Sequence, residues 1–181
     1  MFRSVRNCPV PVVARVQGPA YGGGVGLVAA CDIVVSSPRA RFAFTEVRLG
    51  IVPGVIAPLV MDRLGQRAAR TCFLTADPIE GQRALQLGLV DRLADDPGDL
   101  DDLVSTTVQS LLRGGPQALS LCKSLLDGVQ SLGFARSGEV AARMIADART
   151  RPEAQAALQA FFAKNPAPWV DEEPWVLPPL E

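Results

Sequence analysis

Residues 18–32 hold the pattern in this 181-residue chain that most readily supports chemistry. Three consecutive glycines, Gly22 to Gly24, follow an apolar β-branched run ending at Val16 and lead into the apolar stretch 25–31. This order predicts a strand, a tight turn and the start of a buried helix. The first N–H groups of a helix lack internal partners and carry partial positive charge. Because glycine lets an oxygen atom approach those N–H groups, we expect an oxyanion-binding corner here.

The same glycines could instead serve only close packing between a strand and a helix. They do not form a P-loop, since no Gly-Lys-Ser/Thr follows them. They do not form a dinucleotide fingerprint either, because no acidic residue closes a second strand at the expected distance. A phosphate or dinucleotide site is therefore not predicted.

The chain contains no histidine. This excludes Ser-His-Asp and Cys-His catalysis and His-ligated metals, and no metal site is predicted. Any general acid or base must then be a carboxylate, Tyr, Lys or Cys. Glu46 is the most suggestive carboxylate, because it stands alone between the apolar segment 41–44 and the turn Pro53-Gly54. It could also be a solvated loop residue or the partner of Arg48.

Composition narrows the class of protein. The net charge is −1 and the basic residues are scattered, so we expect no nucleic-acid partner. No signal-peptide pattern and no apolar run of membrane-spanning length occur, so we expect a cytoplasmic protein without a membrane partner. The four cysteines show no C-x-x-C spacing and are predicted to be buried free thiols: Cys8, Cys31, Cys72 and Cys122.

The elements that would position the glycines and Glu46 form an α/β segment up to about residue 95. Short strands are predicted at 12–16, 33–36 and 41–44, with a last one formed by Leu89, Val90 and Leu93. Helical spacing is predicted at 55–64 and 66–74, split by Gly65, and at 79–87, closed by Gly88.

Beyond residue 95 the apolar spacing is helical. Helices are predicted at 100–112, 116–129, 139–148 and 152–164, with Asp99 or Asp101 as the cap of the first. The Pro-rich tail 166–181 is expected to be extended or disordered, held by Trp169. The apolar stripes of these helices could pack on the chain's own core or on another subunit.

Three motifs in this order are similar to a known family. Residues 11–18, 21–33 and 41–54 resemble the crotonase family of enoyl-CoA hydratases and isomerases. Residues 74–76 and 84–90 look like the next segment of that family, and 161–166 resemble its C-terminal helix. The resemblance implies part of a ββα spiral core at 1–95, a helical oligomerisation segment at 96–165, and the extended tail at 166–181.

The resemblance also implies a chemistry. Members of the family bind an acyl-CoA thioester and stabilise its enolate with two backbone N–H groups. By resemblance, Gly23 is one of these donors, with Gly22 and Gly24 beside it in the substrate-binding corner. Glu46 matches the second acid/base carboxylate of the hydratases, and no cofactor beyond the thioester substrate is implied.

Pro53 and Gly54 match substrate-contacting positions of the family, where Gly54 would present its N–H to water or substrate. Gly26 is also a substrate-binding position by resemblance; the first carboxylate of the hydratase pair falls there, and glycine has no side chain. With Val55-Ile56-Ala57 after Gly54, this departure resembles the branch acting on 3-methylglutaconyl-type substrates. The leading hypothesis is an enoyl-CoA hydratase using Glu46. The alternatives are an isomerase with Glu46 as its sole base and an inactive assembly subunit or remnant.

The front third of the family, with its Ala-Gly-x-Asp segment, has no counterpart in this sequence. The resemblance assigns the second oxyanion donor and much of the adenine pocket to that third. It further implies a homotrimer or a dimer of trimers held by the C-terminal helices.

Overall fold

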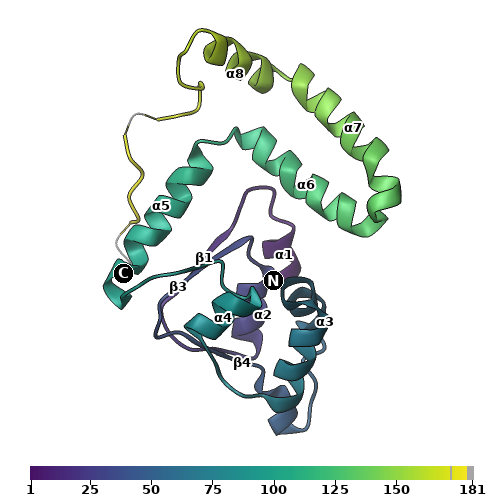
Figure 1. Ribbon diagram of the computed structural model, residues 1–181, viewed down its shortest axis with the longest axis vertical. Coiled ribbons are helices and arrows are strands. Elements are labelled where there is room, and N and C mark those ends of the chain that lie inside the picture. Colours follow the sequence, from purple (N-terminus) through teal and green to yellow (C-terminus); the bar gives the residue numbers. More distant parts are fainter. Residues whose placement is uncertain (172, 179–181) are drawn as a thin grey trace. The chain divides into compact units, whose positions relative to one another are not determined.

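The computed structural model describes residues 1–171 and 173–178 (Figure 1). It contains two compact units, one mainly of Met1–Cys8 and Val12–Thr106 and the other of Pro9–Pro11 and Thr107–Val176. Strands and helices alternate in the first unit and the second is helical, which confirms the predicted α/β class with a C-terminal helical part. The division of the chain at residues 95 and 165 into a spiral core, an oligomerisation segment and a tail stays a prediction.

Two small sheets frame the first unit. One has the strand order β1 (Val13–Val16), β3 (Ile33–Ser36) and β6 (Arg92–Leu93), all parallel. The other has the order β2 (Ala20–Tyr21), β4 (Arg41–Ala43) and β5 (Ile79–Glu80), with β5 antiparallel to β4. Parallel strands need a crossover connection, and the path from β1 to β3 runs through β2 and helix α2 (Gly23–Ala30). The glycine triplet therefore lies where this crossover enters its helix.

Helix α2 is buried because almost every side chain on it is small or apolar. Val25 and Ala30 are fully buried, and the helix contacts both α1 (Phe2–Arg6) and α3 (Ala57–Thr75). A helix that is apolar on all sides belongs in a core. This core position holds the α2 N-terminus in a fixed place.

Polar side chains tie the ends of these elements together. The Asp32 carboxylate accepts a hydrogen bond from the Val12 N–H at 2.7 Å, just before β1, so Asp32 has a structural role. Arg63 on α3 donates to the Cys31 carbonyl at 3.0 Å and forms an ion pair with Asp91. Buried backbone groups require such partners, and here they link α3 to the end of α2.

Some predicted boundaries in this unit are confirmed and others are wrong. Helix α3 is interrupted at Gly65, whose φ of 71° and ψ of 160° are not helical, as predicted. The helix expected from residue 79 begins at Gly81 as α4 (Gly81–Leu87), because Ile79 and Glu80 pair with β4. Leu89 is not in the last strand, since its N–H returns to the Ala84 carbonyl at 2.9 Å.

A 3-10 helix, η1 (Thr45–Leu49), follows β4, and a second, η2 (Pro97–Asp99), precedes α5 (Leu100–Leu112). The expected capping role of Asp99 or Asp101 is wrong for α5 itself. Asp96 and Asp99 form a reciprocal capping box around η2, because the chain enters α5 through this tighter turn.

The remaining helices are α6 (Pro116–Leu132), α7 (Phe134–Thr150) and α8 (Pro152–Phe162). Helix α6 ends three residues later than predicted, α7 is longer than predicted at both ends, and α8 ends two residues earlier than predicted. Helix α7 contacts both α6 and α8. The Trp169 indole N–H donates to the Arg113 carbonyl at 3.2 Å, which confirms the predicted attachment of the tail. Residues 172 and 179–181 of that tail lie outside the described residues.

The cysteine prediction is correct in part. All four cysteines are free; Cys31 and Cys72 are buried and Cys8 is half-buried. Cys122 is exposed, because it lies on α6, which the second unit leaves partly uncovered. Burial raises the pKa of the Cys72 thiol, which disfavours its thiolate form and any use as a nucleophile.

Candidate active site

The glycine triplet forms a strained corner at the start of α2. Gly22 has φ of 51° and ψ of −120°, a conformation that L side chains rarely adopt, and its N–H donates to the Ala43 carbonyl at 2.9 Å. The Gly22 carbonyl accepts from the N–H groups of Val25 at 3.1 Å and Gly26 at 3.2 Å, which begins the helix. The corner is thus fixed to β4 on one side and to α2 on the other.

This corner leaves two donors for a ligand. Within the described part of the chain, the N–H groups of Gly23 and Gly24 form no hydrogen bond to a backbone or side-chain acceptor. They are the first two N–H groups of an eight-residue helix, where the dipole is positive. An oxygen carrying negative charge is the chemical group that fits them.

Glu46 lies beside the same corner. Its Oε1 atom stands 3.5 Å from the position that a Cβ atom on Gly22 would occupy. Its Oε2 atom is buried and has no hydrogen-bond partner among the described residues. Burying a carboxylate oxygen without a partner is costly, so the arrangement suits a group that receives a proton or a ligand.

The alternative explanations for Glu46 do not hold. Arg48 forms its ion pair with Asp77 at 3.4 Å, so the Glu46–Arg48 pair is not present. Glu46 is not a solvated loop residue either, since it belongs to η1 and one of its oxygen atoms is buried. The η1 turn is closed by Gly50 in the left-handed region, and the Ile51 N–H donates to the Glu46 carbonyl at 3.2 Å.

Gly26 marks a place where no side chain can fit. It is buried, and a Cβ atom on it would overlap Cγ2 of Ile56 and stand 2.9 Å from the Ile56 Cβ. Ile56 itself is only 3% exposed, so it cannot easily swing away. The absence of an acid at residue 26 is therefore matched by an apolar side chain that occupies its space.

Pro53 and Gly54 lie on the loop that leads into α3. Pro53 is buried, and its carbonyl accepts from the Ala57 N–H at 2.9 Å. The Gly54 N–H donates to the Val52 carbonyl at 2.8 Å. This N–H is already used within the loop, so the expected donation from Gly54 to water or substrate does not occur in this conformation.

A cavity of about 560 Å³ adjoins this site. The Phe2 ring connects the two, because its Cζ lies 3.8 Å from a Cβ position on Gly23 and its Cε1 3.4 Å from that on Gly26. Gly54, on the loop that leads into α3, also lines the cavity. The residues lining the cavity are Met1, Phe2, Arg3, Arg6, Gly54, Val55, Pro58 and Leu59.

Comparison with known proteins decides the family. The family model described as "Enoyl-CoA hydratase/isomerase" matches residues 1–172. The chain belongs to this family. A Thermus thermophilus protein named as an enoyl-CoA hydratase is 34% identical over 166 residues, which are 92% of this chain and 65% of the relative.

Solved structures are similar to this chain over most of its length. An enoyl-CoA hydratase from Shewanella pealeana is 35% identical with a TM-score of 0.87, over 93% of this chain and 63% of its own. Pseudomonas aeruginosa AtuE is 34% identical with a TM-score of 0.89, over 94% and 66% of the two chains. The chain therefore spans about two thirds or less of the length of these relatives.

Two residues of this candidate site were not found from the sequence. Phe2 lies at the first turn of a five-residue helix and carries no pattern of its own. Ile56 follows Gly54 in an apolar run, and only the meeting of α2 and α3 brings it against Gly26. Among the described residues no cluster of His, Cys, Asp and Glu could hold a metal ion, and none of their helices is long and apolar enough to cross a membrane.

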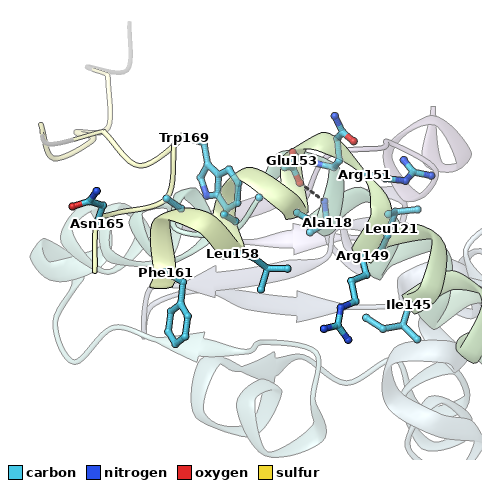
Figure 2. Close-up of a pocket in the computed structure, with 16 residues that line it drawn as sticks. Ala118, Leu121, Ile145, Arg149, Arg151, Glu153, Leu158, Phe161, Asn165 and Trp169 are labelled. Carbon is cyan, nitrogen blue, oxygen red and sulfur yellow. Dashed lines mark hydrogen bonds between the residues drawn. The ribbon is translucent and has the colours of Figure 1, made fainter. Parts of the chain in front are cut away.

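The second unit contains an apolar groove of about 620 Å³ between α6, α7, α8 and the segment of Trp169. Figure 2 shows Ile145, Leu158 and Trp169 around it, with the Glu153 carboxylate accepting from the Ala118 N–H at 3.0 Å. Glu153 also accepts from the Gln117 N–H at 3.0 Å and so caps α6. Beside this groove, Phe161 and Phe162 are 73% and 79% exposed.

Proposed function

We propose that this chain carries the reacting groups of an enzyme that adds water across the 2,3 double bond of an enoyl-CoA thioester. The observation that carries the proposal is the buried, unpartnered Glu46 oxygen beside the free N–H groups of Gly23 and Gly24. One site thus holds a proton carrier and donors for an oxyanion. The names of the relatives from Thermus and Shewanella support the same reaction class.

In the proposed reaction the thioester oxygen is bound at the corner by the Gly23 N–H. The Glu46 carboxylate removes a proton from water as the water oxygen bonds to C3, and the double-bond electrons move to give an enolate. The enolate oxygen is stabilised by the Gly23 N–H, which meets more negative charge in the transition state than in the ground state. Protonated Glu46 then delivers its proton to C2, which leaves the carboxylate as it was.

Isomerisation is the second candidate, and the Gly26–Ile56 contact favours it. Ile56 fills the space of a side chain at residue 26, so Glu46 is the carboxylate available at the described corner. Moving a double bond from C3 to C2 needs only one such group: Glu46 removes a proton from C2 and returns it to C4. The enolate formed between these steps would use the same N–H donor.

A substrate panel distinguishes these candidates. Purified protein is assayed with crotonyl-CoA, a 3-enoyl-CoA and 3-methylglutaconyl-CoA, with products separated by chromatography against reference 2-enoyl and 3-enoyl thioesters and identified by mass spectrometry. Addition of 18 mass units to crotonyl-CoA is expected of a hydratase, and conversion of the 3-enoyl isomer alone is expected of an isomerase. Preference for 3-methylglutaconyl-CoA would support the proposed branch. Failure to bind or convert any of the three would favour an inactive assembly subunit.

We also propose that the second unit assembles copies of the chain into a homotrimer or a dimer of trimers. Its outer helices expose large apolar side chains, including Leu126 at 63% and Ile145 at 67%. Exposed apolar surface of this kind is typical of subunit interfaces. Light scattering is expected to give the mass of three or six chains. Phe161→Ser with Phe162→Ser should lower that mass, and a monomeric parent protein would contradict the proposal.

We further propose a cytoplasmic location, no cofactor beyond the thioester substrate, and no nucleic-acid or membrane partner. The net charge of −1 agrees with the nucleic-acid expectation.

A further inference from the structure

We infer that the cavity beside the oxyanion corner binds an acyl chain that ends in a carboxylate, with Arg3 as the group that recognises it. This inference rests on the proposed function, because it concerns the substrate of the same site. The 3-methylglutaconyl group of the proposed branch is one such chain, and the inference adds the cavity that would hold it and the residue that would recognise its carboxylate.

The position of the cavity fits the acyl chain of a thioester held at the corner. The Phe2 ring lies against Gly23 and Gly26 and also lines the cavity, so the two spaces share one wall. A thioester oxygen bound by the Gly23 N–H would have its acyl chain close to this ring. Ile56 fills the space above Gly26, so the acyl chain would extend along the Phe2 side, where the cavity lies.

The walls of the cavity suit an apolar chain. Val55, Pro58 and Leu59 come from the loop and the first turn of α3, and Phe2 comes from α1. A volume of about 560 Å³ is within the ordinary range for small-molecule pockets. Burying methylene groups against these walls would contribute binding free energy in proportion to their area.

The charge of the cavity points to an anionic end group. Arg3 and Arg6 line it, and no acidic residue does. Arg6 pairs with Asp62 at 3.0 Å, whereas the Arg3 guanidinium forms no ion pair or hydrogen bond with any described residue. A planar guanidinium matches a carboxylate in a bidentate geometry. A carboxylate at the end of the acyl chain would therefore supply an ion-pair partner for Arg3.

The test compares two saturated thioesters of equal chain length, hexanoyl-CoA and adipoyl-CoA, by calorimetry with the whole chain. Neither can react, so binding is read without turnover. We expect adipoyl-CoA to bind about tenfold more tightly than hexanoyl-CoA, since a charge-assisted pair is stronger than a neutral contact. In Arg3→Gln this difference in affinity should disappear, while the affinity for hexanoyl-CoA stays within about twofold of the parent value.

Arg70→Gln is the matched control, because Arg70 is an exposed arginine on α3 outside the cavity. It should leave both affinities unchanged. Equal binding of the two thioesters by the parent protein would overturn the inference and leave the proposed function intact. If Arg3→Gln weakened both thioesters and free coenzyme A alike, Arg3 would bind a phosphate of the coenzyme, which also overturns it. If neither thioester bound, the proposed function itself would fail.

Discussion

Glu46→Gln is expected to lower kcat by about a thousandfold, within the range that a positioned general acid or base contributes. Glutamine keeps the shape of the side chain but cannot take a proton from water or from C2 of the substrate and return it to another carbon. Because the Gly23 and Gly24 N–H groups remain, KM should change little. Steady-state kinetics on the best substrate of the panel, with far-UV circular dichroism to show unchanged folding, measures this effect.

Asp77→Asn provides the matched control for this loss. Asp77 pairs with Arg48, which lies two residues from Glu46 in the sequence, and the Asp77 side chain is 73% exposed. The same change from carboxylate to amide there should leave kcat within about twofold, since surface ion pairs contribute little. Full activity of Glu46→Gln would show that another group moves the proton and would remove the basis of the proposed mechanism.

Gly26→Ala is expected to destabilise the first unit by about 1–3 kcal/mol, the usual cost of inserting atoms into a close-packed core. Its new methyl group would overlap Cγ2 of Ile56, which is buried and has no free space to enter. Urea unfolding followed by far-UV circular dichroism, with the midpoint and slope compared, measures the change.

Gly24→Ala is the control from the same helix. A Cβ atom on Gly24 would meet only the Ala20 Cβ, at an ordinary 3.8 Å. Alanine is a better helix former than glycine, so Gly24→Ala should be neutral or stabilising by up to about 1 kcal/mol. Adding Ile56→Ala to Gly26→Ala removes the overlapping atom, and the two changes should be less costly together than their sum. If Gly26→Ala unfolded at the parent midpoint, the Ile56 contact would not restrict residue 26.

Much of the first unit could be predicted because its signals are local. The β-branched run 33–36 predicts the strand that β3 forms, and a glycine in the middle of a helical pattern marks the interruption of α3 at Gly65. The helix α5 also has the predicted bounds, since its apolar spacing is regular and Gly114 follows it. In each case the residue pattern within one short segment is sufficient to predict the element.

Predictions failed where a neighbour in space overrides the local pattern. Ile79 and Glu80 have helical spacing with the residues that follow, but hydrogen bonding to β4 makes them a strand. Leu89 and Val90 have strand-like composition, but their N–H groups return to Ala84 at the end of α4. The capping role moved from α5 to η2 because Asp96 and Asp99 satisfy each other's N–H groups first.

The sequence by itself determined the family and the residue types of the candidate site. A glycine triplet before an apolar helix and a lone Glu46 in a chain without histidine already indicated oxyanion and proton chemistry. Tertiary structure alone decided that the second Glu46 oxygen is buried without a partner, that Ile56 occupies the space at Gly26, and that Phe2 joins the corner to a cavity. The physical reason is that burial and steric exclusion depend on which distant segments pack together, and no single segment records its own neighbours.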